Sequence, residues 1–192
     1  GLVPLLTSKK EYYSNSGTYL TEPVRSFNNY VKALLIGGGR LYGKSLIDFS
    51  CGRGGDLKKW FSSKYERVVG LDYSKVGIES MDPAIGALGR IDSMKKNNPA
   101  FAKWADNVKL FWADTSKIVS GHVQNGICNE KQRELAKPEL EKKFDVGVSF
   151  FTAHYYFESP SKIRGFFQNL FDNIDNKGVA IITCFDGVEL FN

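Results

Sequence analysis

Residues 45–56, with the sequence SLIDFSCGRGGD, constrain the fold of this chain more than any other stretch. A short apolar run at 46–49 breaks into a turn that contains Gly52, Gly54 and Gly55, and a helical pattern of apolar residues follows. This order of strand, tight turn and helix is typical of the first unit of an open parallel sheet, which binds a nucleotide-like ligand beyond its strand ends. Glycines suit such a turn because they let the backbone bend sharply and let a ligand approach closely.

A second strand is predicted at 68–71, and it ends in Asp72, about 20 residues after the glycine turn. A carboxylate at this position can accept hydrogen bonds from the two adjacent hydroxyls of a ribose. The turn reads Ser-x-Gly-x-Gly-Gly, which differs from the Gly-x-Gly-x-x-Gly of dinucleotide sites. Asp56 would repel a pyrophosphate at the helix start and suits an ammonium group, whereas Arg53 is able to partner a phosphate.

S-adenosylmethionine (SAM) carries an adenine, a ribose and a zwitterionic amino-acid tail, so it fits this set of residues best. The alternative is that Asp56 is an ordinary helix N-cap and that the glycines only form the turn.

Apolar runs alternate with helical periods along the chain, which predicts an α/β fold. Three further strands are expected at 108–112, 144–150 and 179–183. Helices are expected from residue 22 to the glycines at 37–39, from 75 to 98 with a break near Pro83 and Gly86, and from 159 to 171. We therefore expect a mostly parallel sheet of order 3-2-1-4-5 with helices on both faces.

The first predicted helix has an apolar stripe formed by Phe27, Val31, Leu34 and Leu35. Asn28 and Lys32 are four residues apart and share another face, where spacing alone predicts two solvated surface groups. In the helix near residue 90, the basic residues Arg90, Lys95 and Lys96 are expected on a solvated face.

The sequence FTAHYYFE at 151–158 follows directly on the fourth predicted strand. An aromatic cluster with one histidine at a strand tip can stack on a base and hydrogen-bond its edge. His154 and Tyr155 indicate function, whereas the phenylalanines of the cluster fit the core equally well.

Composition is compatible with one domain of 192 residues, of which 42% are apolar, and a net charge of +5 permits a nucleic-acid partner without requiring one. Three cysteines without metal spacing favour an intracellular, reducing compartment, and with only two histidines we expect no metal site. We also expect no signal peptide, since residues 1–6 lack a basic start, and no membrane helix, since no apolar run approaches about 20 residues.

Four segments of this sequence resemble the messenger-RNA cap guanine-N7 methyltransferases, particularly those of large DNA viruses: RSFNNYVK at 25–32, IDFSCGRGGDL at 47–57, VGLD at 69–72 and FTAHYYFES at 151–159. The first and last segments are specific, because SAM enzymes in general share only the glycine loop. The resemblance implies a Rossmann-like class I SAM-dependent methyltransferase domain at 23–192, after an irregular lead-in at 1–22. It implies transfer of a methyl group from SAM to N7 of the guanine cap of mRNA.

The resemblance also implies roles for individual residues. SAM would be held by Lys32, Ser50, Gly52, Gly54, Asp56, Asp72, Asp114, Phe150 and Tyr155. Within this set, Lys32 would pair with the SAM carboxylate, Asp72 with the ribose and Asp114 with the adenine edge. The cap guanosine and its phosphates would be contacted by Asn28, Asn29, Arg53, Lys59 and His154.

No acid or base is implied, because guanine N7 has a free lone pair and loses no proton on attack. His154 and Tyr155 would only position the reactants, and no metal is implied. Catalysis would come from alignment of the nucleophile with the methyl group.

The chain departs from the family in two respects. Ser50 stands where the loop usually has its first glycine, and the chain ends at Asn192, before the two strands that the family adds next. We therefore expect either a fragment of a larger capping enzyme or a naturally shortened relative. The implied partners are the capped RNA 5′ end and other capping-enzyme domains on the same polypeptide, with no membrane.

The implied location is cytoplasmic if the chain comes from a cytoplasmic DNA virus, with packaging in the virion as a further option. Two other functions stay open: a SAM-binding module that is inactive or regulatory, and a methyltransferase for a small molecule or a protein.

Overall fold

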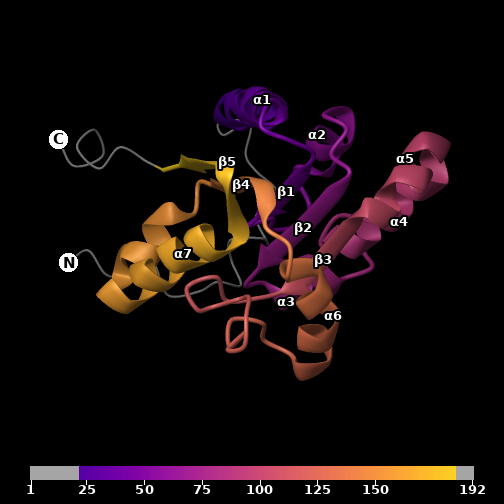
Figure 1. The fold of residues 1–192 in the computed structure, drawn as a ribbon. Coiled ribbons are helices and arrows are strands. Elements are labelled where there is room, and N and C mark those ends of the chain that lie inside the picture. Colours follow the sequence, from indigo (N-terminus) through magenta and orange to yellow (C-terminus); the bar gives the residue numbers. More distant parts are fainter. Residues whose placement is uncertain (1–21, 185–192) are drawn as a thin grey trace, which may run out of the picture.

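The computed structural model describes residues 22–184 of the chain, and in this part five strands form one sheet of order β3-β2-β1-β4-β5 (Figure 1). Every pairing of neighbouring strands is parallel, and β1 lies at the centre. The predicted strand order is therefore confirmed. The strands are β1 (Ser45–Asp48), β2 (Arg67–Asp72), β3 (Val108–Trp112), β4 (Phe144–Phe150) and β5 (Ile174–Thr183).

Helices cover both faces of the sheet, as predicted, so that α1 and α2 lie on one side while α6 and α7 lie on the other (Figure 1). The α-helices are α1 (Glu22–Gly39), α2 (Leu57–Ser62), α3 (Lys75–Glu79), α4 (Ala87–Asn97), α5 (Pro99–Trp104), α6 (Glu130–Leu140) and α7 (Pro160–Asn173). Two 3₁₀ helices, η3 (Ala105–Asn107) and η4 (Ala153–Glu158), complete the described chain. None of the described helices is long and apolar enough to cross a membrane.

Side chains alternate across the strands and feed two hydrophobic cores, one on each face. Leu46 of β1 packs with Trp60 and Tyr65 on the face covered by α1 and α2. Ile47 packs on the opposite face with Phe166 of α7. Because both faces are covered, most residues of β1, β2 and β4 are buried, and the apolar ones dominate in the middle of each strand.

Asp145 of β4 holds the start of β1 from a position 100 residues away in sequence. Its carboxylate accepts hydrogen bonds from the backbone N–H of Lys44 at 2.8 Å and of Ser45 at 2.9 Å, and from the Ser45 hydroxyl. These hydrogen bonds outweigh the effect of burial and lower the pKa of Asp145. The contact fixes β4 against β1 at the end of the sheet opposite the glycine turn.

The structure differs from the sequence prediction at both ends of the described part. Helix α1 continues through the three glycines and ends at Gly39 rather than before them. Strand β5 begins at Ile174, before the predicted start at 179, and its pairing with β4 shifts register in this first part. Of the lead-in predicted at 1–22, residues 1–21 lie outside the described part, and residue 22 begins α1.

The predicted apolar stripe of α1 is wrong for two of its residues. Phe27 is 65% exposed and Leu34 is 57% exposed, while Ile36 is buried. The inner face of α1 carries Leu35 and Ile36, which pack on the core, and also Lys32, whose ammonium binds a buried carboxylate of the glycine turn. An ion pair and apolar contacts thus share the packed face of α1.

Candidate active site

The glycine turn after β1 folds back onto the tip of β2. Gly52 and Gly54 have φ angles of 54° and 68°, a region that L side chains rarely adopt, so glycine is favoured at both positions. The N–H of Gly52 donates to one carboxylate oxygen of Asp72 at 2.8 Å, and the N–H of Ser74 donates to the other at 2.8 Å. These two bonds fix the orientation of the carboxylate that was predicted to hold a ribose.

Asp56 is buried at the start of α2, and only 5% of its surface is exposed. Its side chain does not cap the helix, so the alternative reading of this residue as an ordinary N-cap is wrong. The carboxylate instead lies between two ammonium groups, with Lys32 Nζ at 2.8 Å and Lys59 Nζ at 2.7 Å. Two cations and one anion are therefore gathered beside the glycine turn.

Lys59, predicted to contact the cap, is engaged within the protein. Besides Asp56, its ammonium group donates to the Asn29 side chain at 3.1 Å and to the carbonyl of Gly55 at 3.3 Å. Lys59 and Asn29 thus join α2 to α1. Asn28 is half-buried, and it lies on α1 one turn before Lys32.

The tip of β4 completes the region around Lys32. Phe150 is 7% exposed, and Lys32 Nζ lies 5.9 Å from the centre of its ring. Ser50 of the turn is near the same tip, with its hydroxyl 3.4 Å from that of Ser149. Lys32 therefore lies beside two other predicted SAM-binding residues, Asp56 and Phe150.

Asp114 follows β3, two strands away from β1 along the same edge of the sheet. Its carboxylate accepts hydrogen bonds from the backbone N–H of Ser116 at 3.1 Å and from the Ser116 hydroxyl. Lys117 Nζ lies 3.5 Å away. This position is compatible with the far, adenine end of a ligand whose amino-acid end lies near Lys32.

The aromatic segment after β4 divides into buried and exposed residues. Tyr156 is buried, whereas Phe157 and Tyr155 are 69% and 49% exposed. His154 is exposed as well, and its ring lies 4.1 Å from that of Tyr155. Local burial lowers the pKa of His154, so its imidazole is mostly neutral at neutral pH. His154 and Tyr155 both lie at the tip of β4, with their rings next to each other.

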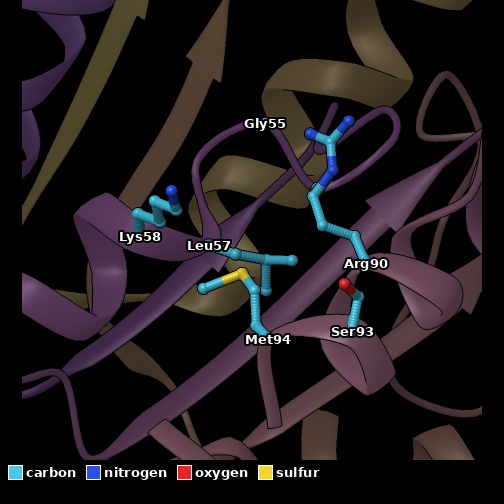
Figure 2. A pocket seen from close by; sticks show the side chains of 7 residues that line it. Gly55, Leu57, Lys58, Arg90, Ser93 and Met94 are labelled. Atoms are coloured by element: carbon cyan, nitrogen blue, oxygen red, sulfur yellow. The ribbon is translucent and has the colours of Figure 1, made fainter. Parts of the chain in front are cut away.

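A cavity of about 350 Å³ lies beside the glycine turn, between α2 and α4 (Figure 2). Figure 2 shows the side chains from α4 facing those from α2 across it. The cavity is lined by Gly54, Gly55, Leu57, Lys58, Arg90, Ser93 and Met94. It therefore combines apolar walls with two cationic side chains.

Arg90 is a residue that the sequence analysis missed. It was expected on a solvated face, but it is half-buried, and its pKa is lowered by burial first and then by the neighbouring Arg53. Arg53 itself donates to the carbonyl of Ala84 at 2.9 Å. The helical spacing of Arg90 and Met94, four residues apart, was the available signal that both share one face of α4.

Asp48 was missed as well, because it read as part of an apolar strand. It is 1% exposed, and its carboxyl oxygen accepts the N–H of Ser50 at 2.8 Å. Burial, reinforced by the nearby charge of Asp56, raises the pKa of Asp48 from 3.8 to about 8. At neutral pH the Asp48 carboxyl group is therefore largely protonated, and it holds the start of the glycine turn through its hydrogen bond with Ser50.

An open parallel sheet of this order, with a glycine turn after the central strand and a carboxylate at the tip of the next, defines the Rossmann-like class I of SAM-dependent methyltransferases. The sequence matches the mRNA (guanine-N(7))-methyltransferase domain over residues 13–192. The chain therefore belongs to this family. The family resemblance and the fold expected from the sequence are both confirmed.

Curated relatives agree with this assignment. The chain is 27% identical over 184 residues to a mimivirus protein named "Probable mRNA-capping enzyme", covering 94% of this chain and 15% of that protein. It is 28% identical over 164 residues to the mRNA cap guanine-N(7) methyltransferase of Schizosaccharomyces pombe, covering 83% of this chain and 38% of that protein. The chain thus spans much less than half of the length of either relative.

Solved structures share the fold. The PH0226 protein of Pyrococcus horikoshii OT3 superposes with a TM-score of 0.59 at 20% identity, covering 95% of this chain and 65% of that one. The methyltransferase domain of bacterial CtHen1-C has a TM-score of 0.51 at 16% identity, covering 81% of this chain and 65% of that one. At these identities the likeness concerns the fold alone.

The residues at the sheet edge fit SAM, the cofactor of this family. Lys32 and Asp56 offer one cation and one anion for a zwitterionic tail. Each carboxylate oxygen of Asp72 accepts one backbone N–H, which orients the carboxylate at the tip of β2, where a ribose would lie. Among the described residues, no group of His, Cys, Asp and Glu side chains is arranged to hold a metal ion.

Proposed function

We propose that this chain transfers a methyl group from SAM to N7 of the guanine that caps messenger RNA. The observation that carries the proposal is the Lys32–Asp56 ion pair beside Phe150, with Asp72 across the glycine turn. This set matches the charges of SAM from its amino-acid tail to its ribose. Bound SAM supplies a methyl group on a sulfonium, which is electrophilic without further activation.

The SAM end of the site follows from these contacts. Asp56 is the natural partner of the ligand ammonium and Lys32 of its carboxylate. Lys59 keeps Asp56 neutralised while Lys32 turns toward the ligand, because Lys59 contacts the other carboxylate oxygen. Asp114 lies at the end of β3, where it suits the adenine edge.

The cap end is supported by the cavity between α2 and α4. A capped RNA carries a triphosphate bridge, which is strongly anionic, and Lys58 and Arg90 line the cavity on either side of the glycine turn. Arg53 is close enough to lower the pKa of Arg90 electrostatically, so a third cation contributes to the local potential. An anion bound there would lie directly beside the SAM tail.

The residues need only align the reactants, because guanine N7 attacks with a free lone pair and no proton has to be removed. His154 and Tyr155 fit this role, since a neutral imidazole and an exposed phenol ring can hydrogen-bond and stack on a base. A methyl group and its acceptor held in line account for the rate in such a mechanism.

Two wider proposals concern the partners and the location of the protein. The mimivirus relative, in which this region is a small part of a named capping enzyme, supports additional capping domains as partners on one polypeptide. The three cysteines are free thiols, which supports a reducing intracellular compartment, the cytoplasm in the case of a cytoplasmic virus.

The test is a methyl-transfer assay with the purified chain, labelled SAM and RNA that begins with GpppG. We expect label in N7-methylguanosine after nuclease digestion, and none when the RNA begins with ApppG or is already N7-methylated. SAM binding by calorimetry without transfer would favour an inactive or regulatory module. Transfer to a protein or a small molecule, but not to GpppG-RNA, would overturn the proposal.

A further inference from the structure

Asn169, in the middle of α7, is fully buried, and its side chain makes all of its observed hydrogen bonds to one loop. Its Oδ1 accepts the backbone N–H of Val119 at 3.0 Å. Its Nδ2 donates to the carbonyls of Thr115 at 2.9 Å and Lys117 at 2.7 Å. One amide therefore holds three backbone groups of the loop that leads away from β3.

The two carbonyls bound by Asn169 flank Ser116 on either side. Ser116 in turn donates from its N–H and from its hydroxyl to the carboxylate of Asp114. Gly165, one helical turn before Asn169 on α7, packs so tightly on this point that an added Cβ would lie 2.0 Å from the Ser116 carbonyl oxygen. A continuous line of contacts thus runs from α7 through Ser116 to Asp114.

The loop contains no regular helix or strand between β3 and α6, so hydrogen bonds and the burial of residues such as Val119 and Ile127 hold its backbone. Beyond the α7 contacts, the Thr115 hydroxyl lies 3.1 Å from the carbonyl oxygen of Phe49 and 2.7 Å from the hydroxyl of Tyr156. The N–H of Asp114 also donates to the carbonyl of Gly126, and a bridge joins Ala113 to Ile127. Figure 1 shows the loop lying beside α7. An irregular backbone segment that is held by a fully buried amide has one well-defined conformation.

We propose that Asn169 is a positioning residue for the adenine end of the SAM site. It sets the orientation of the Asp114 carboxylate by fixing the two peptide carbonyls around Ser116. This inference rests on the proposed function, and it adds a residue of α7, remote from the ligand, as a determinant of nucleobase selectivity. The loop presents the carboxylate, and the contacts from α7 help to set its orientation.

The test compares the binding of S-adenosylhomocysteine with that of its inosine analogue, in which an oxo group replaces the amino group of adenine. A carboxylate accepts a hydrogen bond from the amino group and repels the oxo group, so the unmodified chain should prefer adenine by about tenfold or more. Calorimetry measures both affinities, and urea unfolding gives the stability of each variant.

Two variants break the line of contacts at different points. Asn169→Leu removes all three loop bonds at similar volume, and Ser116→Ala removes the hydroxyl bond to Asp114 without touching α7. Both should bring the adenine preference close to unity. The matched control is Asn173→Leu, since Asn173 is equally buried on α7 but bonds only to the backbone carbonyl of Asn169.

A folded Asn169→Leu variant that keeps the adenine preference would overturn the inference, and so would an equal loss in Asn173→Leu. If Asn169→Leu does not fold, an unchanged preference in Ser116→Ala overturns it. Failure of the unmodified chain to bind S-adenosylhomocysteine would overturn the proposed function together with the inference. Tight binding with a preference that is lost only in the two test variants supports both.

Discussion

The ammonium of Lys32 on α1 lies 2.8 Å from the carboxylate of Asp56 at the start of α2, although the two groups are suited to the two opposite charges of one amino-acid tail. The pair is a ready counterpart for an amino acid, whose ammonium and carboxylate can each take one partner. Because Lys59 also contacts Asp56, the buried carboxylate keeps a counter-ion when Lys32 changes partner. Loss of both lysines would leave a buried charge uncompensated.

Replacement of Lys32 by Met should weaken SAM binding more than it lowers stability. The lost charge-assisted hydrogen bond corresponds to about 1.5–3 kcal/mol, or roughly 10- to 150-fold in Kd. The loss of folding stability should be small, because Lys59 remains beside Asp56 as its counter-ion. Calorimetric titration checks the affinity, with Lys44→Met as control, since the Lys44–Glu66 pair is exposed. Equal affinities for the two variants would contradict the assignment.

Asp72→Ala should reduce SAM affinity, and the structure adds a cost in stability. The carboxylate holds the N–H groups of Gly52 and Ser74, so its removal leaves two half-buried donors without their acceptor. Asp72→Asn keeps one acceptor oxygen, and it should retain more of the stability while still losing about tenfold or more in affinity. Urea unfolding and calorimetry separate the two effects. Unchanged SAM affinity in a folded variant would refute the ribose assignment.

Arg90→Met should raise the KM for capped RNA about tenfold or more, with little change in SAM affinity, because Arg90 lines the cavity and not the amino-acid end of the site. The dependence of KM on salt concentration should also weaken, since one phosphate contact is lost. The control is Lys96→Met on the same helix, because Lys96 pairs with Asp92 at the surface. If both variants behave alike, the cavity is not the phosphate site.

His154→Ala should lower the rate of transfer to capped RNA at subsaturating cap concentration and leave SAM binding nearly intact. The reason is that His154 is exposed beside Tyr155 at the acceptor side of the strand tip. Transfer assays and calorimetry on the same preparation test this separation. Normal transfer would leave His154 as a structural loop residue, and joint loss of SAM binding would assign it to the cofactor wall.

The buried carboxyl of Asp48 should make stability fall as the pH rises. The unfolded chain releases this proton near the ordinary pKa of 3.8, whereas the folded chain keeps it up to about pH 8. Between these values the folded state binds more protons, so the free energy of unfolding decreases with increasing pH. Asp48→Asn keeps the acceptor for the Ser50 N–H and removes the titration.

The measurement for Asp48 is urea unfolding at several values between about pH 5 and pH 8. Relative to Asp48→Asn, the unmodified chain should lose a few kcal/mol across this range, because each pKa unit corresponds to about 1.4 kcal/mol. Asp175→Asn, on the exposed side of β5, is the control. Parallel pH profiles for the unmodified chain and Asp48→Asn would show that Asp48 titrates normally.

The strands and their order could be predicted because buried parallel strands leave an apolar run in the sequence, and the glycine turn identifies the central one. The face of α1 that packs on the rest of the protein could not be predicted in this way. Its apolar residues Phe27 and Leu34 suggested the packed side, whereas the side that packs carries Lys32, whose carboxylate partner is 24 residues away. The pattern of apolar residues in a helix does not reveal an ion pair with a residue that is distant in sequence.

Most of the candidate site residues lie along one edge of the sheet, but the role of Asn169 and the partial burial of Arg90 were not predicted. Asn169 reads as a polar residue of an amphipathic helix, and its role depends on an irregular loop 50 residues earlier in the chain. The helical pattern around Arg90 predicts a surface position. Arg90 lines a cavity because residues of α2 and α4 enclose it together. Irregular loops and the angles between helices are set by tertiary packing, which local patterns do not encode.

The bond between Asp145 and Ser45 has a consequence for how the protein folds. It closes a loop of 100 residues, and the pairing of β1 with β4 requires the same closure, whereas β1 and β2 are joined by a short connection. Closing so long a loop is entropically costly and slow, so β4 is expected to dock late. Asp56 and Asp72 both come from the early half, while Phe150 arrives with β4. Affinity for SAM would then develop only at the final step of folding, and ligand binding during synthesis on the ribosome would report that the second half of the sheet has closed.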